Sequence, residues 1–269
     1  MSQSELGTSK SWSTLKILDV KVDLVDYSKA VSLIKEGISK QFSGRYICAS
    51  PVHPIIVSRK DISLKDALNN SWLTVPDGMP VVWAAKLLGG TIKNRVYGPE
   101  LMLRSCKMAE HYGFSIFLYG STLQALNKLE VNLKKRFPRL QITGTYSPPF
   151  RDLSAKEGKK VNEMLNSCQP DILFVGLGAP KQEKWMANHC PKLNVPVTMG
   201  VGAAFDFISG EKKQAPVWMQ NAGLEWLYRL VSEPRRLWKR YLWGNIIFCF
   251  LLSINFIRAN KIKDNETVL

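Results

Sequence analysis

Several signatures of common enzyme sites are missing from this 269-residue sequence. Its five cysteines are scattered without a CxxC pair, and the odd number argues against a disulfide framework or a zinc ribbon. Its three histidines have no ligand-like spacing and no two aspartates occur as Asp-x-Asp, so metal chemistry has little support. A reducing compartment is the simpler expectation.

Glycine- and serine-centred motifs are missing as well. The chain has no GxGxxG or Walker loop for a dinucleotide or a kinase-type triphosphate, and no GxSxG elbow for a serine nucleophile. Residues 1–14 are polar and lack an apolar core, so we expect a flexible N-terminal tail and not a secretory signal. These absences together predict a cytoplasmic protein.

Positive charge, in contrast, is abundant. Lys and Arg number 37 against 22 Asp and Glu, which gives a formal net charge of +15. Such an excess favours acidic partners, namely phosphates, anionic lipids or nucleic acid. Hydrophobic residues make up 45% of the chain, enough for a sizeable core.

Short apolar runs alternate with helical stretches from residue 15 to about residue 208. Alternating apolar and polar residues over 15–24 predict one half-buried strand, and a helix is expected over Ala30–Ile38. Six further strands are expected at 45–50, 72–77, 114–120, 140–146, 171–178 and 195–202. We therefore predict an α/β fold, a Rossmann-like and mainly parallel sheet with helices on both faces. Ligands of such sheets bind beyond the carboxyl ends of the strands.

The chain divides into three predicted segments. A flexible tail (1–14) precedes an α/β catalytic domain (15–208), and a basic, Trp-rich helical appendage (209–269) follows. The appendage interleaves Arg and Lys with Trp and Tyr, a mixture typical of the bilayer interface, although it also suits a diphosphate or single-stranded nucleic acid.

Residues 241–257 of the appendage are apolar and have basic residues on both sides. This segment would span a membrane at the short limit, lie in the membrane surface, or pack inside an oligomer. The basic flanks, which suit an anionic leaflet, are Arg235, Arg236, Lys239 and Arg240 before it and Arg258, Lys261 and Lys263 after it.

Three predicted strand exits carry candidate site residues. Asp77, between Pro76 and Gly78, is either a catalytic carboxylate or part of an ordinary Pro-Asp-Gly turn. The Gly-x-Gly loop in 171–185 lets a ligand approach the backbone and leads to a lysine at a helix start, which suits an anion; a plain tight turn is the alternative. Asp206 lies among apolar residues and needs a donor, from a ligand or from the backbone.

Five stretches together resemble the WecG/TagA/CpsF glycosyltransferases (glycosyltransferase family 26) of bacterial surface-polysaccharide synthesis. They are LTVPDGMPVVWAAKLLG (73–89), NRVYGPELM (94–102), DILFVGLGAPKQEKW (171–185), GVGAAFDFISGEKKQAPVWMQNAGLEWLYRL (200–230) and EPRRLWKRYL (233–242). The resemblance implies an inverting, metal-independent enzyme that moves a hexose, N-acetylmannosamine or a related sugar, from a UDP-sugar to a polyprenyl-diphosphate-linked acceptor. The implied product belongs to surface polysaccharide or teichoic acid synthesis. The implied location is peripheral, on the inner face of the cell membrane at an anionic surface.

The resemblance also implies roles for individual residues. Asp77 would be the general base that takes the proton of the acceptor hydroxyl. On the donor side, Arg95 would steady the phosphates, Gln182 would line the sugar pocket, and Asp206 would hold the uracil. The acceptor's diphosphate would meet three cations, Arg229, Arg236 and Lys239.

One departure from the family pattern concerns the end of the strand at 45–50. The family commonly shows Thr-x-Asn there, whereas this chain has Ala49-Ser50-Pro51. Ser50 would supply a substrate-binding hydroxyl after a shift of one residue, but the asparagine amide has no substitute. A catalytically weak nucleotide-sugar-binding scaffold is therefore one alternative function, and a basic nucleic-acid-binding protein is another. The preferred interpretation has no nucleic-acid partner and leaves a homo-oligomer open.

Overall fold

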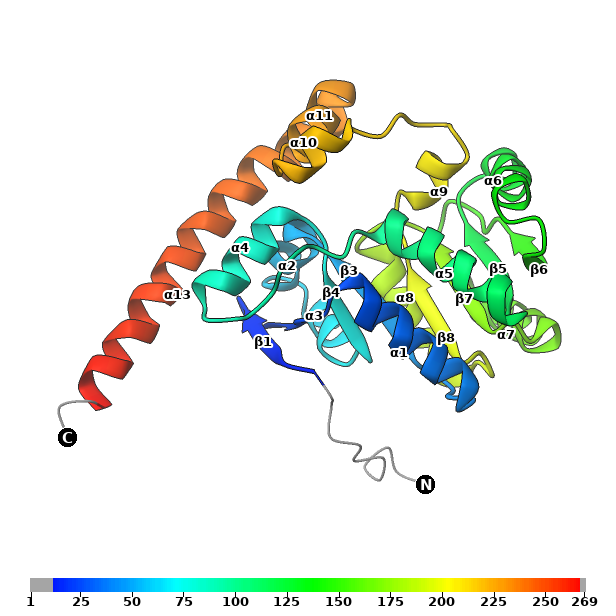
Figure 1. Ribbon diagram of the computed structural model, residues 1–269, viewed down its shortest axis with the longest axis horizontal. Coiled ribbons are helices and arrows are strands. Elements are labelled where there is room, and N and C mark those ends of the chain that lie inside the picture. Colours follow the sequence, from blue (N-terminus) through cyan, green and yellow to red (C-terminus); the bar gives the residue numbers. More distant parts are fainter. Residues whose placement is uncertain (1–11, 267–269) are drawn as a thin grey trace.

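Six parallel strands form the central sheet of the protein, drawn in Figure 1 from a computed structural model that describes the backbone of residues 12–266 and the side chains of residues 12–256. The strands are β3 (Tyr46–Ser50), β4 (Leu73–Pro76), β5 (Ser115–Gly120), β6 (Gln141–Tyr146), β7 (Ile172–Gly176) and β8 (Val197–Gly200). Their order across the sheet is β4-β3-β8-β7-β5-β6, and all neighbours are parallel. The predicted Rossmann-like fold and its six strands are confirmed.

Helices cover both faces of this sheet. Along the chain they are α1 (Tyr27–Ser39), α2 (Val52–Ser58), α3 (Ile62–Asn69), α4 (Met79–Leu87), α5 (Gly98–Tyr112), α6 (Leu123–Arg136), α7 (Ala155–Cys168), α8 (Lys181–His189), the 3₁₀ turn η1 (Cys190–Lys192) and α9 (Ala204–Ile208). In β5, Ile116 and Leu118 join a core cluster with α1, α5 and α6, whereas Phe117 and Tyr119 join a second cluster with α2, α3, α7 and α8. Burial on both faces explains why β3, β4, β5, β7 and β8 read as largely apolar runs in the sequence, whereas the edge strand β6 is partly exposed and mixes polar with apolar residues.

The register of the sheet brings the strand exits together. Ser50 is paired with Pro76, Val175 with Gly200, and Gly120 with Gly176. The loops that follow these residues therefore meet at one edge of the sheet, where the candidate site residues lie.

The single strand expected over residues 15–24 is wrong. The segment is a hairpin of β1 (Thr14–Ile17) and β2 (Val20–Asp23), which form a separate antiparallel pair. Leu18 and Asp19 turn the chain with positive φ angles of 48° and 70°, as the two central residues of a tight hairpin turn require. The alternation matches the burial of Ile17, Val20 and Val22 but not that of Asp23, whose side chain is fully buried. It gave no sign of the reversal, because neither turn residue is glycine. Residues 1–11 of the expected tail lie outside the described residues, and Thr14 already belongs to β1.

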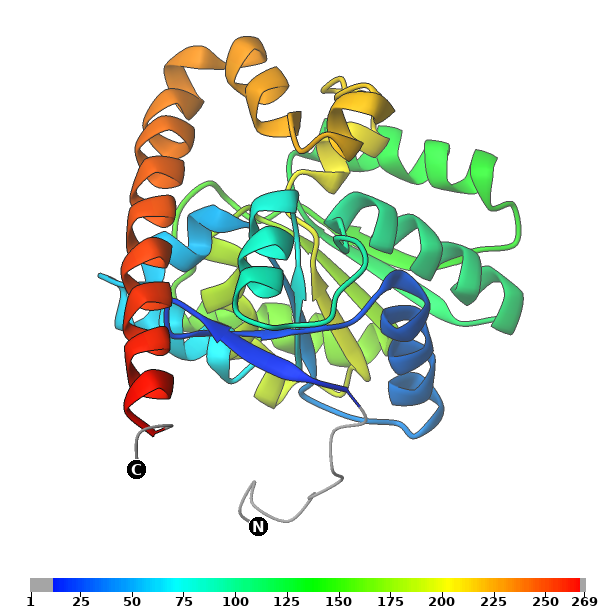
Figure 2. The same ribbon diagram turned by 60° about the vertical axis from the view of Figure 1, so that its left-hand side comes forward.

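The appendage is helical, as predicted, in its described part. Its elements are α10 (Val217–Asn221), α11 (Glu225–Ser232), α12 (Pro234–Trp238), the π-helical turn η2 (Lys239–Trp243) and α13 (Gly244–Glu266). Figures 1 and 2 show α10 and α11 beyond one end of the sheet and α13 running as a long rod beside the hairpin side of the molecule. Helix α13 packs against α2 through the buried Phe248. The domain boundary at residue 208 stays a prediction.

The alternative in which residues 241–257 span a membrane depends on the length and hydropathy of the helices. Within the part of the chain that the structure describes, no helix combines the length and the apolar character that crossing a bilayer requires. Ile257 and the expected basic flank at Arg258, Lys261 and Lys263 have side chains outside the described residues.

Candidate active site

A cleft of about 890 Å³ lies at the edge of the sheet where the strand exits meet. We call it the large cleft. Its lining includes Ala49, Asp77, Ser121, Gly178, Gln182, Asp206, Arg229 and Arg236. Its volume lies within the range of ~300–1,000 Å³ that small-molecule sites usually have.

A second, smaller cleft meets the large cleft at Asp77. This small cleft lies between the N-terminus of α4 and the appendage, and its lining includes His53, Gly78, Met79, Arg95, Glu225, Trp226, Tyr241 and Asn245. Both clefts share Pro51, Asp77, Tyr97, Arg229 and Arg240. Asp77 therefore stands where a ligand in one cleft would meet a ligand in the other.

The backbone fixes the position of Asp77 at the exit of β4. Its own N–H donates to the Ser50 carbonyl at 3.3 Å, and its carboxylate lies beside Gly98 at the start of α5. Gly78 has a φ of 99°, a backbone conformation that residues with a side chain rarely adopt, and the chain turns there directly into α4. The turn expected from Pro-Asp-Gly is present, and it presents the carboxylate to both clefts.

The surroundings of Asp77 make it a weaker acid than an ordinary aspartate. Burial, helped by the negative charge of Glu225, raises the pKa of Asp77 to about 7, although Arg95 and Arg229 act in the opposite direction. A carboxylate with a pKa near neutrality is well matched to accept a proton at physiological pH.

Arg95 connects the α/β domain to the appendage. Its guanidinium pairs with the Glu225 carboxylate at 2.7 Å, donates to the Gln220 side-chain oxygen at 3.0 Å, and lies over the Tyr97 ring. It lines the small cleft beside Asp77, and it is not part of the large cleft's lining. The expected contact of Arg95 with donor phosphates stays a prediction.

Gln182 and Asp206 both line the large cleft, and their expected contacts with the donor's sugar and uracil stay predictions. The Gln182 side-chain oxygen accepts from the Gly202 N–H at 2.9 Å, and its amide donates to Glu183 at 3.0 Å, so its orientation is fixed. Asp206 pairs with Lys212 at 3.1 Å. The carboxylate predicted to need a donor therefore has one.

The three cations expected at the acceptor's diphosphate are not all at the site. Arg229 and Arg236 line the large cleft, whereas Lys239 is exposed and lies outside the lining of both clefts, near the Trp238 ring. Arg240, the next residue along the chain, lines both clefts.

Ser50 is buried, and its hydroxyl has no hydrogen-bond partner. Its neighbours Ala49 and Pro51 line the large cleft, but Ser50 does not. Its predicted role in substrate binding is untested, and so is metal independence. In the described residues no group of three or more His, Cys, Asp and Glu side chains could hold a metal ion.

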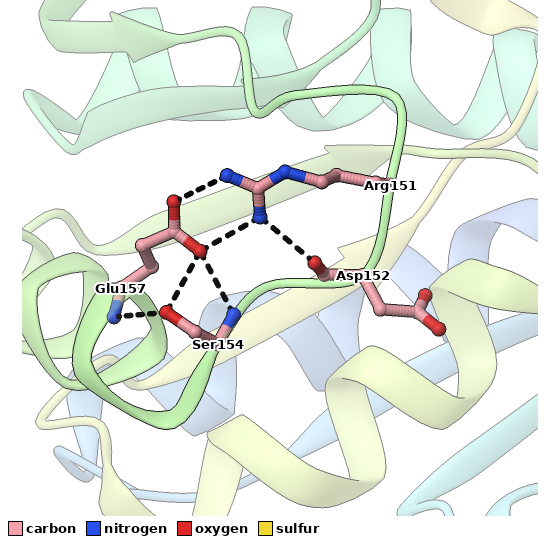
Figure 3. Close-up of polar contacts among 4 residues, drawn as sticks. All are labelled: Arg151, Asp152, Ser154 and Glu157. Carbon is pink, nitrogen blue, oxygen red and sulfur yellow. Dashed lines mark hydrogen bonds and ion pairs between the residues drawn. The ribbon is translucent and has the colours of Figure 1, made fainter.

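The loop 147–153 forms a further wall of the large cleft and is held by an arginine–carboxylate pair, shown in Figure 3. The Arg151 guanidinium donates to both Glu157 oxygens at 2.8 and 2.7 Å and to the Asp152 carbonyl at 3.0 Å. Ser154 caps α7 and also donates to Glu157, so one carboxylate joins the loop to the helix.

Sequence reasoning missed Arg151, Glu225 and Arg240 as cleft residues. Glu225 meets Arg95 from 130 residues further along the chain, a pairing that no local pattern indicates. Arg240 was noted only as one residue of a basic run. Whether Arg240 or Lys239 lines the clefts depends on the helical register through η2.

The parallel α/β fold and the junction of two clefts at a carboxylate with a raised pKa, with guanidinium groups on both sides, are features of an enzyme active site. The description of the matching family is more specific. The family model "Glycosyl transferase WecG/TagA/CpsF family" matches residues 15–262, and the chain belongs to this family. It is a glycosyltransferase of the hexosyltransferase type.

Three similar proteins carry the same name, N-acetylglucosaminyldiphosphoundecaprenol N-acetyl-beta-D-mannosaminyltransferase. One from Bacillus subtilis (strain 168) is 34% identical over 198 residues, which cover 72% of this chain and 74% of the relative. One from Staphylococcus aureus (strain MW2) is 31% identical over 226 residues, 83% of this chain and 85% of the relative. One from Bacillus spizizenii (strain ATCC 23059 / NRRL B-14472 / W23) is 28% identical over 224 residues, 82% and 85% respectively.

Proposed function

We propose that this glycosyltransferase transfers N-acetylmannosamine from a UDP donor to N-acetylglucosamine carried on a polyprenyl diphosphate, in the synthesis of a bacterial cell-envelope polymer. The names of relatives at 28–34% identity support the donor sugar and the acceptor. The observation that carries the proposal is Asp77, a carboxyl with a pKa of about 7 at the junction of two clefts.

The reaction proposed for Asp77 is general base catalysis of an inverting displacement. Asp77 takes the proton of an acceptor hydroxyl, the oxygen attacks the anomeric carbon of the donor sugar, and the bond from that carbon to the diphosphate oxygen breaks. In-line attack requires the acceptor and the departing diphosphate to lie on opposite sides of the sugar. Two clefts that meet at the base satisfy this requirement.

We assign the donor to the large cleft and the acceptor sugar to the small cleft. The large cleft holds Asp206 for the uracil and Gln182 for the sugar, at glycine-containing strand exits. The small cleft offers the ring of Trp226 and a neutral imidazole, because burial and the nearby Arg240 lower the pKa of His53 to about 4. Aromatic faces and neutral polar groups suit a sugar ring.

Attachment to the membrane surface is part of the proposal, because a polyprenyl acceptor stays in the bilayer. The appendage exposes large apolar side chains, namely Val217, Trp218, Leu227, Val231, Trp238, Leu242, Trp243, Ile246, Ile247 and Phe250. The basic residues Arg235 and Lys239 are exposed on the same segment. Apolar and basic groups together favour peripheral binding to an anionic leaflet.

The direct test is a transfer assay with the full chain, a soluble short-chain prenyl-diphosphate N-acetylglucosamine, and a panel of UDP-sugars. With UDP-N-acetylmannosamine as the donor, we expect release of UDP and formation of a disaccharide lipid. Mass spectrometry with glycosidase digestion should show one added N-acetylhexosamine in β linkage. Transfer from another UDP-sugar alone would replace the proposed donor.

A second candidate, a nucleotide-sugar-binding scaffold with weak catalysis, is favoured by the β3 exit. There the large cleft is lined by Ala49 and Pro51, neither of which has a polar side chain, while the Ser50 hydroxyl is buried. UDP binding by calorimetry without transfer from any donor would select this function over the first.

A further inference from the structure

Arg240 is a cation at the junction of the two clefts that makes no ion pair with the described side chains, whereas Arg95 in the small cleft is paired with Glu225. It lies on η2, is largely buried, and lines both clefts together with Asp77 and Arg229. Its Nε atom is buried and has no hydrogen-bond partner. A guanidinium carries five N–H donors in a planar fork, and leaving such donors unsatisfied in a buried place is costly.

The nearby carboxylates do not form an ion pair with Arg240: the charge of Glu183 acts on it only from beyond ion-pair distance, and two others are already paired. Glu233 pairs with Arg236 at 2.6 Å and Glu225 pairs with Arg95 at 2.7 Å. Among the side chains that the structure describes, no carboxylate lies within ion-pair distance of Arg240. Arg229, Arg236 and Arg240 thus converge on the large cleft with more positive charge than the protein itself neutralises.

The π-helical turn explains which basic residue faces the clefts. Arg236 and Arg240 are four residues apart and both line the large cleft, whereas Lys239, three residues after Arg236, lines neither cleft. The hydrogen bonding of a π turn reaches one residue further than that of an α-helix, and such turns often occur at functional sites.

We infer that Arg240, and not Lys239, is the third diphosphate-binding residue of this site, together with Arg229 and Arg236. A diphosphate ester fits because its charge matches several guanidinium groups and its oxygens can accept paired N–H donors. The inference rests on the proposed function for the identity of the ester. The diphosphate belongs either to the departing UDP or to the polyprenyl acceptor, since Arg240 borders both clefts.

The test compares Arg240→Gln with Lys239→Gln, a neighbouring change that removes the same charge outside the clefts. Calorimetry with UDP and with inorganic pyrophosphate measures binding at the donor site. The KM for the short-chain prenyl-diphosphate acceptor reports on the acceptor site. We expect Arg240→Gln to lose roughly tenfold or more in one of these quantities, as for a lost charge-assisted hydrogen bond, and Lys239→Gln to stay near the wild type. Weaker UDP and pyrophosphate binding would assign Arg240 to the donor, and a raised acceptor KM alone would assign it to the lipid.

Arg240→Lys is measured alongside, because it keeps the charge and most of the packing but loses the planar fork. We expect it to lie between the wild type and Arg240→Gln. The inference is overturned if every folded Arg240 variant matches the wild type in all three quantities, or if Lys239→Gln is equally impaired. Pyrophosphate binding does not depend on sugar transfer, so a wild type that binds it but transfers no sugar would contradict the proposed function only.

Discussion

At the scale of single residues, the proposed chemistry depends on keeping Asp77 partly buried beside both negative and positive neighbours. We expect Asp77→Asn to lower turnover roughly a hundredfold or more, the usual scale for removing a general base, while UDP affinity stays unchanged. Steady-state kinetics and calorimetry of the purified variant test this. Near-normal turnover would remove Asp77 from the mechanism.

The thermal stability of Asp77→Asn is the control that distinguishes lost catalysis from lost folding. The folded-state pKa of Asp77, about 7, lies above that of an unfolded aspartate, so the folded protein holds the proton more readily. The contribution of this carboxyl to stability is therefore full below pH ~4 and falls as the pH rises to about 7. Asp77→Asn should melt no lower than the wild type at pH 8, which separates lost chemistry from lost structure.

The pH dependence of turnover should reveal the influence of Glu225 on Asp77. Activity should rise with pH through about 7 as Asp77 loses its proton, and Glu225→Gln should move this limb to lower pH because it removes a negative neighbour. Glu183, whose pKa burial also raises to about 7, has no such dependence on Glu225. Gln220→Ala is the matched control, since it removes the other partner of Arg95 without a change of charge. An unmoved limb in Glu225→Gln would mean that another group titrates.

Asp206 should contribute to binding and not to the chemical step. A contact with the uracil is made equally in the ground and transition states, so Asp206→Ala should raise the donor KM and leave kcat nearly unchanged. Lys212→Ala, which removes the ion-pair partner, should have a weaker effect of the same kind. Unchanged UDP affinity in Asp206→Ala would make this carboxylate structural.

At the scale of elements, the loop 147–153 owes its position over the large cleft to α7. Glu157→Gln should free the Arg151 guanidinium and raise the donor KM by about threefold, with little change in melting temperature, because exposed ion pairs contribute little to stability. Arg104→Gln removes a comparable exposed pair on α5, outside the clefts, and should not change the donor KM. Equal KM values for all three proteins would show that the loop does not order the donor.

Some secondary-structure elements could be predicted from the sequence and others could not. Strands β3, β4, β5, β7 and β8 were predictable because each is buried and reads as a largely apolar run ended by a turn residue. The edge strand β6 is partly exposed and mixes polar with apolar residues, so its signal in the sequence is weaker. Asp77, Gln182 and Asp206 were placed at strand exits for the same reason. Residue patterns do not encode the remaining features. The β1–β2 hairpin and the Arg95–Glu225 pair depend on tertiary contacts. The presence of Arg240 and not Lys239 in the cleft linings depends on one turn of helical register.

At the scale of the whole molecule, charge should help to hold the protein at a membrane surface. Reversing the exposed Arg235 and Lys239 to Glu should abolish sedimentation with anionic vesicles, since each basic residue near such a surface contributes ~1 kcal/mol. UDP affinity should be retained because neither residue lines a cleft. Reversal of Lys156 and Lys160 on α7 changes the net charge equally and should leave vesicle binding intact. Unimpaired sedimentation of the appendage variant would assign membrane attachment to the apolar side chains.

The position of β8 in the sheet has a consequence for synthesis on the ribosome. This strand joins the pair β4-β3 to the trio β7-β5-β6, yet it is the last of the six to be made. At ~5–20 residues per second, β3 and β4 wait on the order of ten seconds for their partner, with one edge of β3 unpaired. The nascent chain therefore carries two half-sheets, and only the arrival of β8 with the loop to Asp206 brings the two halves of the large cleft together. Arrest of translation before β8 should leave a chain with an open strand edge, prone to association and without a complete large cleft.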